Sequence, residues 1–283
     1  MKTHVIAVDW GSTHLRAWQG EKTLSLPLGV SRLDGRSPRE IFDRHIAPWR
    51  ESTTTPVVMA GMIGSDAGWQ AVPYLPCPLP LQALSSNLCE VAENVWIVPG
   101  LKVEGENVMR GEETQLLGAM QLSPAACYVM PGTHSKWVQV VDGQVTGFTT
   151  AMTGELHHLL MSHSLIGSGL PQQIDDDAAF REGLMRGLRS PTLVSELFRN
   201  RAARVLGNLP ATSVSDALSG LLIGAEVSSL LAVHPVKAVT LVASTSLSAR
   251  YQTAFATAHV EVCCVSGDRA FLQGIRSIID ERR

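Results

Sequence analysis

The first residues whose types and spacing can do chemistry follow a short apolar run, Val-Ile-Ala-Val at residues 5–8. Such a run is typical of a buried strand, and Asp9 stands at its end. Gly11 allows a tight turn, and Ser12 and Thr13 bring hydroxyl and N–H groups that can bind an anion. Arg16 can add a forked cation. An aspartate that closes an ordinary β-turn has the same local sequence, so both interpretations stay open here.

A second strand–turn–strand unit lies near the middle of the chain. An apolar run at residues 128–130 leads into Pro131 and then Gly132-Thr133-His134-Ser135-Lys136, and Asp142-Gly143 predicts a hairpin farther on. Because two such turns lie half a chain apart, we expect both to contact the phosphates of the same nucleotide, from opposite sides.

Two further stretches are candidates for substrate chemistry. The expected strand at 56–60 runs into a glycine-rich loop that contains Met62, Ile63, Gly64, Ser65 and Trp69. Glycines after a strand let backbone approach a ligand, although a flexible connector would look the same.

Arg110, Glu112 and Glu113 stand where a helix begins. Acids at a helix start suit the helix dipole, which is the ordinary explanation. The functional alternative is a general base just ahead of the second turn.

Composition narrows the class of protein. The chain has 283 residues, 45% of them hydrophobic, and a net charge of −3 without a long basic stripe, which predicts a packed globular protein and argues against nucleic acid as a partner. No signal peptide or membrane-spanning run is evident. Five cysteines without a Cys-x-x-Cys pair indicate neither a disulfide framework nor a zinc site, so we expect a cytoplasmic protein.

Hydrophobic patterns predict a mixed α/β fold with two lobes, residues 1–120 and 121–283. Strands are expected at 4–9, 14–19, 22–28, 56–60, 95–98, 128–130, 137–141, 144–149, 238–243 and 260–265. Helices are expected at 38–49, 82–92, from 112, from 152, at 176–206 with a break at Ser190-Pro191, and at 215–234, 246–258 and 268–279. The arginines of the 176–206 helices predict a solvated face.

These motifs together resemble the 2-dehydro-3-deoxygalactonokinases, a family of the actin/hexokinase-like (ribonuclease H-like) ATPase superfamily. The resemblance rests on five runs: Asp9 to Trp18, Gly61 to Ser65, Met109 to Gln115, Met130 to Trp137 and Met152 to Leu156. Matches at 218–226 and 247–251 extend it to nearly the whole chain. The family implies mixed sheets flanked by helices and transfer of a phosphoryl group from ATP to the 6-hydroxyl of 2-dehydro-3-deoxy-D-galactonate.

The resemblance also implies roles for the candidate residues. Asp9 would orient Mg²⁺ through water, while Arg16 and Lys136 would offset charge. Phosphate contacts would come from both turns, and nucleoside contacts from the segment around Ser244, where we expect a glycine. Glu112 would be the base, with Glu113 as the second candidate. The Gly61–Ser65 loop, Trp69 and Arg110 would bind the acidic substrate, and a homodimer is compatible with the sequence.

Two alternatives remain at this stage. One is a kinase for another sugar or sugar acid on the same fold, which a substrate panel separates. The other is an ATP-dependent clamp or polymerising protein, which would hydrolyse ATP slowly without an acceptor.

Overall fold

The apolar runs near the start of the chain form a six-stranded mixed sheet with the order β3-β2-β1-β4-β8-β7. Its strands are β1 (Ile6–Trp10), β2 (Leu15–Gln19), β3 (Lys22–Leu26), β4 (Val57–Ala60), β7 (Cys89–Ala92) and β8 (Val95–Ile97). β1 pairs antiparallel with β2 and parallel with β4. Because β1 and β4 are parallel, the turn after Asp9 and the loop after Ala60 leave the sheet at the same edge.

The computed structural model describes residues 5–190 and 192–282. Residue 4 of the first expected strand and Pro191 of the expected helix break lie outside the described residues. The described chain forms two units: 5–124, 138–148 and 265–282 in unit 1, and 125–137 and 149–264 in unit 2. This grouping differs from a division at residue 120, because two later segments belong with the N-terminal part.

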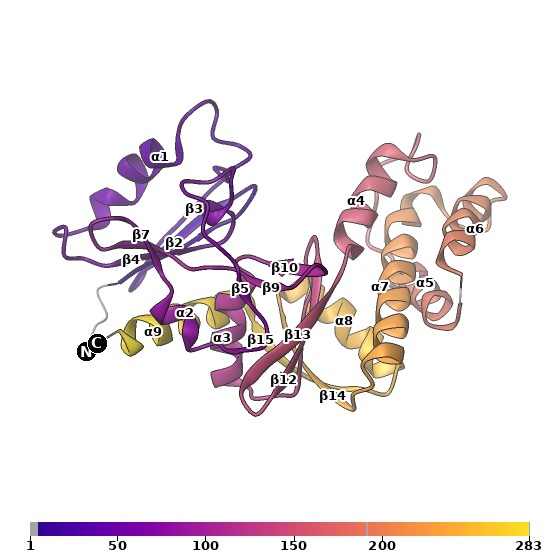
Figure 1. Cartoon of the computed structure of the whole chain (residues 1–283). Coiled ribbons are helices and arrows are strands. Elements are labelled where there is room, and N and C mark those ends of the chain that lie inside the picture. Colours follow the sequence, from indigo (N-terminus) through magenta and orange to yellow (C-terminus); the bar gives the residue numbers. More distant parts are fainter. Residues whose placement is uncertain (1–4, 191, 283) are drawn as a thin grey trace. The chain divides into compact units, whose positions relative to one another are not determined.

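In unit 1, α1 lies on one side of the first sheet and α9 and α3 on the other (Figure 1). The helices of this unit are α1 (Pro38–His45), η1 (Ala47–Trp49), η2 (Met62–Gly64), α2 (Ala83–Ser86), α3 (Glu112–Leu122) and α9 (Gly267–Glu281). α3 and α9 touch backbone to backbone: a Cβ on Gly118 would lie 1.9 Å from the Ala270 carbonyl oxygen, and one on Gly274 would lie 1.9 Å from that of Thr114. This close packing explains why the C-terminal helix belongs to unit 1.

The remaining strands form two further sheets. A small sheet has the order β10-β9-β5, and a six-stranded sheet has the order β15-β14-β11-β12-β13-β6. These strands are β5 (Leu75–Pro76), β6 (Leu79–Pro80), β9 (Leu101–Val103), β10 (Asn107–Met109), β11 (Cys127–Met130), β12 (Ser135–Val141), β13 (Gln144–Ala151), β14 (Ala238–Ala243) and β15 (Glu261–Ser266).

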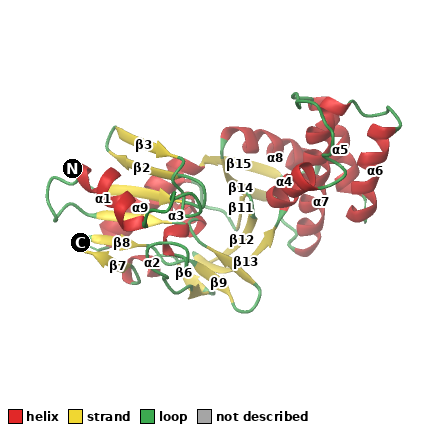
Figure 2. Cartoon of the chain, turned by 90° about the horizontal axis from the view of Figure 1, so that it is seen from above, coloured by secondary structure: helices red, strands yellow, loops and turns green. Residues whose placement is uncertain are grey.

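Unit 2 is rich in helices, and α4 to α7 gather into a helical cluster (Figure 2). Its helices are α4 (Thr153–His163), α5 (Asp177–Arg189), α6 (Leu193–Val205), η3 (Ala211–Ser213), α7 (Val214–Val233) and α8 (Thr245–Thr257). α5 and α7 interlock through Gly183, Gly187, Gly220 and Gly224, where added Cβ atoms would lie 2.0–2.5 Å from the other helix. The segment Ala211–Val233 is long and apolar enough to cross a membrane, but 61% of its apolar 18-residue window is buried.

Most expected elements are present within a residue or two of their predicted ends. Ser37 caps α1 through a capping box with Glu40, as its sequence predicts. The helix expected at 82–92 is wrong: only Ala83–Ser86 is helical, and β7 then pairs antiparallel with β8. Asn94, with φ 56°, forms the turn between these strands, and its left-handed backbone is incompatible with a continuing helix. The short strands β9 and β10 had no clear sequence signal.

Candidate active site

The first turn is braced from its carbonyl side. The N–H groups of Val30 and Ser31 donate to the carbonyl oxygens of Gly11 and Ser12, each at 3.0 Å. Gly29 lies so close that an added Cβ would stand 2.2 Å from the backbone of Ser12. The N–H of Ser12 has no acceptor among the described residues, and the side chain of Ser12 is exposed. The Gly11 N–H donates to the His14 carbonyl at 2.9 Å, so the turn is held closed while the Ser12 N–H remains available to an anion.

Asp9 forms an ion-paired group with two other side chains. Arg16 donates through Nη2 to the Asp9 carboxylate and through Nη1 to Asp268, the latter at 2.6 Å. Burial raises the pKa of Asp9, Arg16 opposes this shift, and the charge of Asp268 adds to it. Arg16 therefore already has two anionic partners, Asp9 and Asp268.

Asp268 is a residue that sequence reasoning missed. It lies in the first turn of α9, where an acid usually serves only the helix dipole. Asp268 and Arg16 are 252 residues apart in the chain, so no local sequence pattern could predict this ion pair.

Two glycines bring the ends of β1 and β4 to the start of α3. Gly61 has φ 100°, and an added Cβ would lie 2.7 Å from the Trp10 carbonyl oxygen and 3.5 Å from Oδ1 of Asp9. Gly111 has φ 108°, and an added Cβ would lie 3.1 Å from Cα of Gly61. Three predicted motifs, the Asp9 turn, the glycine loop and the start of the acidic helix, therefore meet within unit 1.

The two glutamates of α3 have different surroundings. Glu112 is partly exposed, and its Oε2 accepts the Arg110 N–H at 3.0 Å. Glu113 is fully buried, accepts the Gly111 N–H at 2.7 Å and the Thr114 hydroxyl at 3.2 Å. Burial, and then the charge of Glu112, raise the pKa of Glu113 to about 8. Only Glu112 has a surface that a substrate can touch.

Arg110 holds the glycine loop and its continuation in place. It donates to the Val72 carbonyl at 2.6 Å and to the Tyr74 hydroxyl at 3.3 Å, and it stacks on the Tyr74 ring at 4.1 Å. Its Nη1 is buried without a partner among the described residues, and a Cβ on Gly64 would lie 2.9 Å from it. Gly64 is therefore needed for Arg110 to keep its position.

Of the residues expected to bind substrate, Ile63 lies in the core of unit 1 and Trp69 packs against that core. Ile63 is fully buried in the cluster with Trp10 and Ile97. Trp69 packs against Phe42, with ring centroids 5.1 Å apart. The buried Ile63 side chain has no surface for a substrate to touch, whereas substrate contact by the partly exposed Trp69 side chain stays a prediction. Met62 and Ser65, by contrast, are partly exposed, and the Ser65 hydroxyl closes the turn on the Met62 carbonyl at 2.7 Å.

The second turn is fixed by the start of α4. Gly132, Thr133 and His134 are exposed, as is the tip of the first turn. The Glu155 N–H donates to the Thr133 carbonyl at 2.9 Å, and the Glu155 carboxylate lies 2.6 Å from Nε2 of His134. A Cβ on Gly154 would lie 2.3 Å from the Gly132 carbonyl oxygen, so only glycine allows this docking.

Ser135 and Lys136, also expected to bind phosphate, are buried in unit 2. Nζ of Lys136 donates to the Thr150 hydroxyl at 3.2 Å. The Ser135 hydroxyl donates to Oε1 of Glu226 at 2.6 Å. The side chain of Ser135 therefore faces inward and anchors the turn, rather than being presented at its tip.

Glu226 on α7 is the centre of that anchor, and sequence reasoning missed it. Its carboxylate accepts hydrogen bonds from Ser135, from Trp137 Nε1 at 2.8 Å, from the Tyr251 hydroxyl at 2.6 Å and from the Thr153 hydroxyl. Burial and the charge of Glu226 raise the pKa of Tyr251 well above its ordinary value. One carboxylate thus ties together β12, α4, α7 and α8.

Ser244 stands between β14 and α8, exposed, with φ −67°. This backbone conformation is open to any residue, so the serine found where a glycine was expected carries no strain.

Comparison with known proteins identifies the family of this chain. Residues 9–278 match the family model described as 2-keto-3-deoxy-galactonokinase. The chain belongs to this family. The 2-dehydro-3-deoxygalactonokinase of Escherichia coli (strain K12) is 53% identical, over 98% of both chains. The predicted family is therefore confirmed.

Solved structures confirm the predicted kinase-family fold. A crystal structure from Sinorhizobium meliloti, of a protein provisionally named a 2-dehydro-3-deoxygalactonokinase, is 33% identical over 97% of both chains, with a TM-score of 0.88. The activator of 2-hydroxyisocaproyl-CoA dehydratase from Clostridium difficile, solved with bound ADPNP, is 13% identical over 98% of this chain and 95% of its own, with a TM-score of 0.52. That second likeness concerns the fold alone, and it agrees with the expected actin/hexokinase-like ATPase fold.

Proposed function

We propose that this protein transfers the γ-phosphoryl group of ATP to the 6-hydroxyl of 2-dehydro-3-deoxy-D-galactonate. Membership of the 2-keto-3-deoxy-galactonokinase family along residues 9–278 is the observation that carries the proposal. The meeting of Asp9, Gly61 and the start of α3 supports it, because a phosphate-binding turn and a general base have to serve one reaction.

Glu112 is the base in this proposal. It is the partly exposed acid of the pair, whereas Glu113 is buried and holds the backbone of the Gly111 turn. A carboxylate that accepts the proton of the sugar hydroxyl makes the oxygen a better nucleophile as it attacks the γ-phosphorus. Glu113 then acts as a positioning residue for the start of α3.

The phosphates of ATP are proposed to contact the N–H groups of Ser12 and Thr13, in the turn that Gly11 closes by donating its own N–H to the His14 carbonyl at 2.9 Å. The exposed second turn, Gly132, Thr133 and His134, supplies further contacts, and the start of α8 at Ser244 contacts the nucleoside. That both turns act on one nucleotide stays a prediction. Arg16 contacts a phosphate oxygen and offsets its charge.

The donor set near the first turn fits Mg²⁺. This ion is usually held by one or two carboxylates together with substrate phosphates and waters. Asp9 and Asp268, which share the Arg16 guanidinium, are two such carboxylates. Asp9 would hold the ion, which when bound offsets negative charge on the phosphates.

Arg110 and the loop of Met62, Gly64 and Ser65 are proposed to recognise the acidic substrate. Nη1 of Arg110 is a donor without a described acceptor, directly beside Gly64. A guanidinium held on three sides by Val72 and Tyr74 is a rigid partner for a carboxylate.

A substrate panel tests the function. ADP release from Mg-ATP is measured with 2-dehydro-3-deoxygalactonate, with its gluconate epimer and with neutral hexoses. The proposal predicts the highest kcat/KM for the galactonate-derived ketoacid. Activity only on a neutral sugar would reassign the substrate, and slow hydrolysis of ATP without any acceptor would instead support a clamp.

A location in the cytoplasm and a homodimer are also proposed, on sequence grounds. The apolar segment Ala211–Val233 is a core helix of unit 2, which agrees with a soluble kinase. Light scattering after size-exclusion chromatography measures the oligomeric state.

A further inference from the structure

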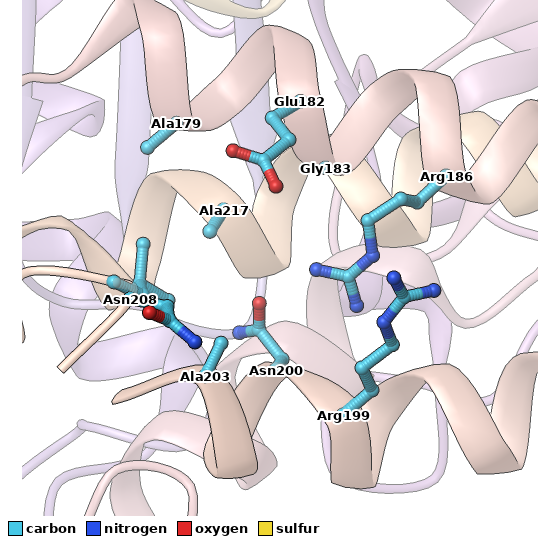
Figure 3. Close-up of a pocket in the computed structure, with 10 residues that line it drawn as sticks. Ala179, Glu182, Gly183, Arg186, Arg199, Asn200, Ala203, Asn208 and Ala217 are labelled. Carbon is cyan, nitrogen blue, oxygen red and sulfur yellow. The ribbon is translucent and has the colours of Figure 1, made fainter. Parts of the chain in front are cut away.

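The helical cluster of unit 2 contains a cavity of about 220 Å³ (Figure 3). It lies against α5, α6 and α7, whose side chains line it. Three of the lining residues, Ala179, Ala203 and Ala217, are small, and this leaves the space open. No motif that the kinase reaction uses includes a residue of this wall.

Asn200 is the unusual residue of the cavity. It is the one fully buried residue of α6 within the described chain, with 0% exposure. Neither its amide nitrogen nor its amide oxygen has a hydrogen-bond partner among the described residues. Leaving a buried polar group unpaired destabilises the fold, so an apolar side chain at this position would be more favourable for stability alone. A ligand that pairs with both atoms of this amide would recover that loss.

Charged groups stand around the same space. In Figure 3 four polar side chains extend from their helices into the space between them: Glu182, Asn200, Arg186 and Arg199. Arg186 is bound to Glu196 at 2.8 Å, whereas Arg199 reaches the same carboxylate only at 3.4 Å and its side chain is 68% exposed. Arg199 is thus the more weakly paired of the two cations, and its exposed side chain has room to turn.

This set of groups defines the chemistry of a ligand. Arg199 is suited to a carboxylate, which it can bind through two parallel hydrogen bonds. Asn200 offers both a donor and an acceptor, and Glu182 offers an acceptor, which together match hydroxyl groups. At about 30 Å³ per water molecule the cavity holds the equivalent of roughly seven waters, which suits a short-chain molecule better than a nucleotide.

We propose that this cavity binds a short-chain hydroxy acid, with its carboxylate on Arg199 and its hydroxyl groups on Asn200 and Glu182. Because Asn200 has no exposed surface without a ligand, entry requires a lining side chain to move, and the exposed Arg199 side chain is the one with space to do so. The site belongs to unit 2 alone and is separate from the residues proposed for phosphoryl transfer.

Isothermal titration calorimetry of the full chain with D-glycerate tests this site. Acetate, which lacks hydroxyl groups, and glycerol, which lacks the carboxylate, are the matched ligands. We expect glycerate to bind in a one-to-one ratio and both matched ligands to bind at least about tenfold more weakly.

Variants locate the binding. Arg199→Gln and Asn200→Leu should each weaken glycerate binding at least about tenfold, while Arg201→Gln, on the same helix but bonded to the Leu165 carbonyl, should change it less than about twofold. Arg199 is exposed, so its variant keeps the fold even if Asn200→Leu does not. No binding to the unsubstituted chain, equal binding by all three variants, or a cavity that holds only water in a crystal soaked with glycerate would overturn the proposal.

Discussion

Glu226→Leu is the perturbation that tests the anchor of the second turn. The substitution keeps much of the side-chain bulk and removes the acceptor of four hydrogen bonds, from Ser135, Trp137, Thr153 and Tyr251. Glu226 is 5% exposed, so water does not readily replace its carboxylate. The second turn should therefore lose its support together with part of the stability of unit 2.

The magnitude follows from the number of donors left behind. Each buried donor without an acceptor costs about 1–3 kcal/mol, so four set a ceiling near 12 kcal/mol. Hydroxyl groups can rotate toward other acceptors, and removing a buried charge is itself favourable, so we expect a loss of about 4 kcal/mol. Glu226→Gln keeps one acceptor oxygen and should recover at least half of it.

Urea unfolding, followed by tryptophan fluorescence, measures the change because Trp137 contacts the carboxylate. Glu261→Gln, at an exposed site on β15, is the control and should stay within about 0.5 kcal/mol. In variants folded at the assay temperature, the KM for ATP should rise more than the KM for the ketoacid. A loss below about 1 kcal/mol for Glu226→Leu, with both KM values unchanged, would refute the anchoring argument.

Three further predictions concern unit 1. Below pH 4.5 the Glu113 carboxyl is neutral in both the folded and the unfolded protein, and between pH 4.5 and about 8 it ionises only on unfolding. The free energy of unfolding should therefore fall by up to about 1.4 kcal/mol per pH unit in that range. Glu113→Gln should remove this slope in urea unfolding at pH 5 to 8, and parallel pH curves for the two proteins would contradict the prediction. Gly64→Val should displace Arg110 and raise the KM for the ketoacid at least about tenfold in steady-state assays; an unchanged KM would exclude this role. Gly274→Leu should separate α9 from the Thr114 carbonyl and cost about 3 kcal/mol or more in thermal unfolding, whereas a native-like Tm would contradict the close packing.

Local patterns in the sequence were enough to single out the parts of the candidate site that are formed by neighbouring residues. The Asp9 turn could be identified because strand, acid and small residues follow one another within a few positions. The same holds for Gly132 to His134 and for the acids at the start of α3. Each of these depends on neighbours in the chain, whose patterns short-range rules describe.

Residues whose role depends on distant partners could not be identified in this way. Glu226 reads as a polar interruption in an apolar helix, and its partner Ser135 lies 91 residues away. Asp268 resembles any acid at a helix start until Arg16 is placed beside it. Ile63 fits a substrate loop by position, yet its side chain is buried in the core of unit 1.

Glycine pairs were a further limit of sequence reasoning. Gly118 and Gly274 look like weak points in two separate helices, but they let α3 and α9 touch, and so they join the last helix to the first unit. The expected helix over 82–92 failed for a related reason, because pairing with β8 outweighed the local preference of residues 89–92.

Phosphorus NMR of the complete reaction measures the central claim most directly. With Mg-ATP and 2-dehydro-3-deoxygalactonate, the unsubstituted protein should form one phosphomonoester coupled to the C6 methylene protons, in amounts equal to the ADP produced. Glu112→Gln should bind ATP and form no detectable ester, while Glu113→Gln keeps turning over. Free phosphate as the main product, an ester at another carbon, or near-normal turnover by Glu112→Gln would contradict the account.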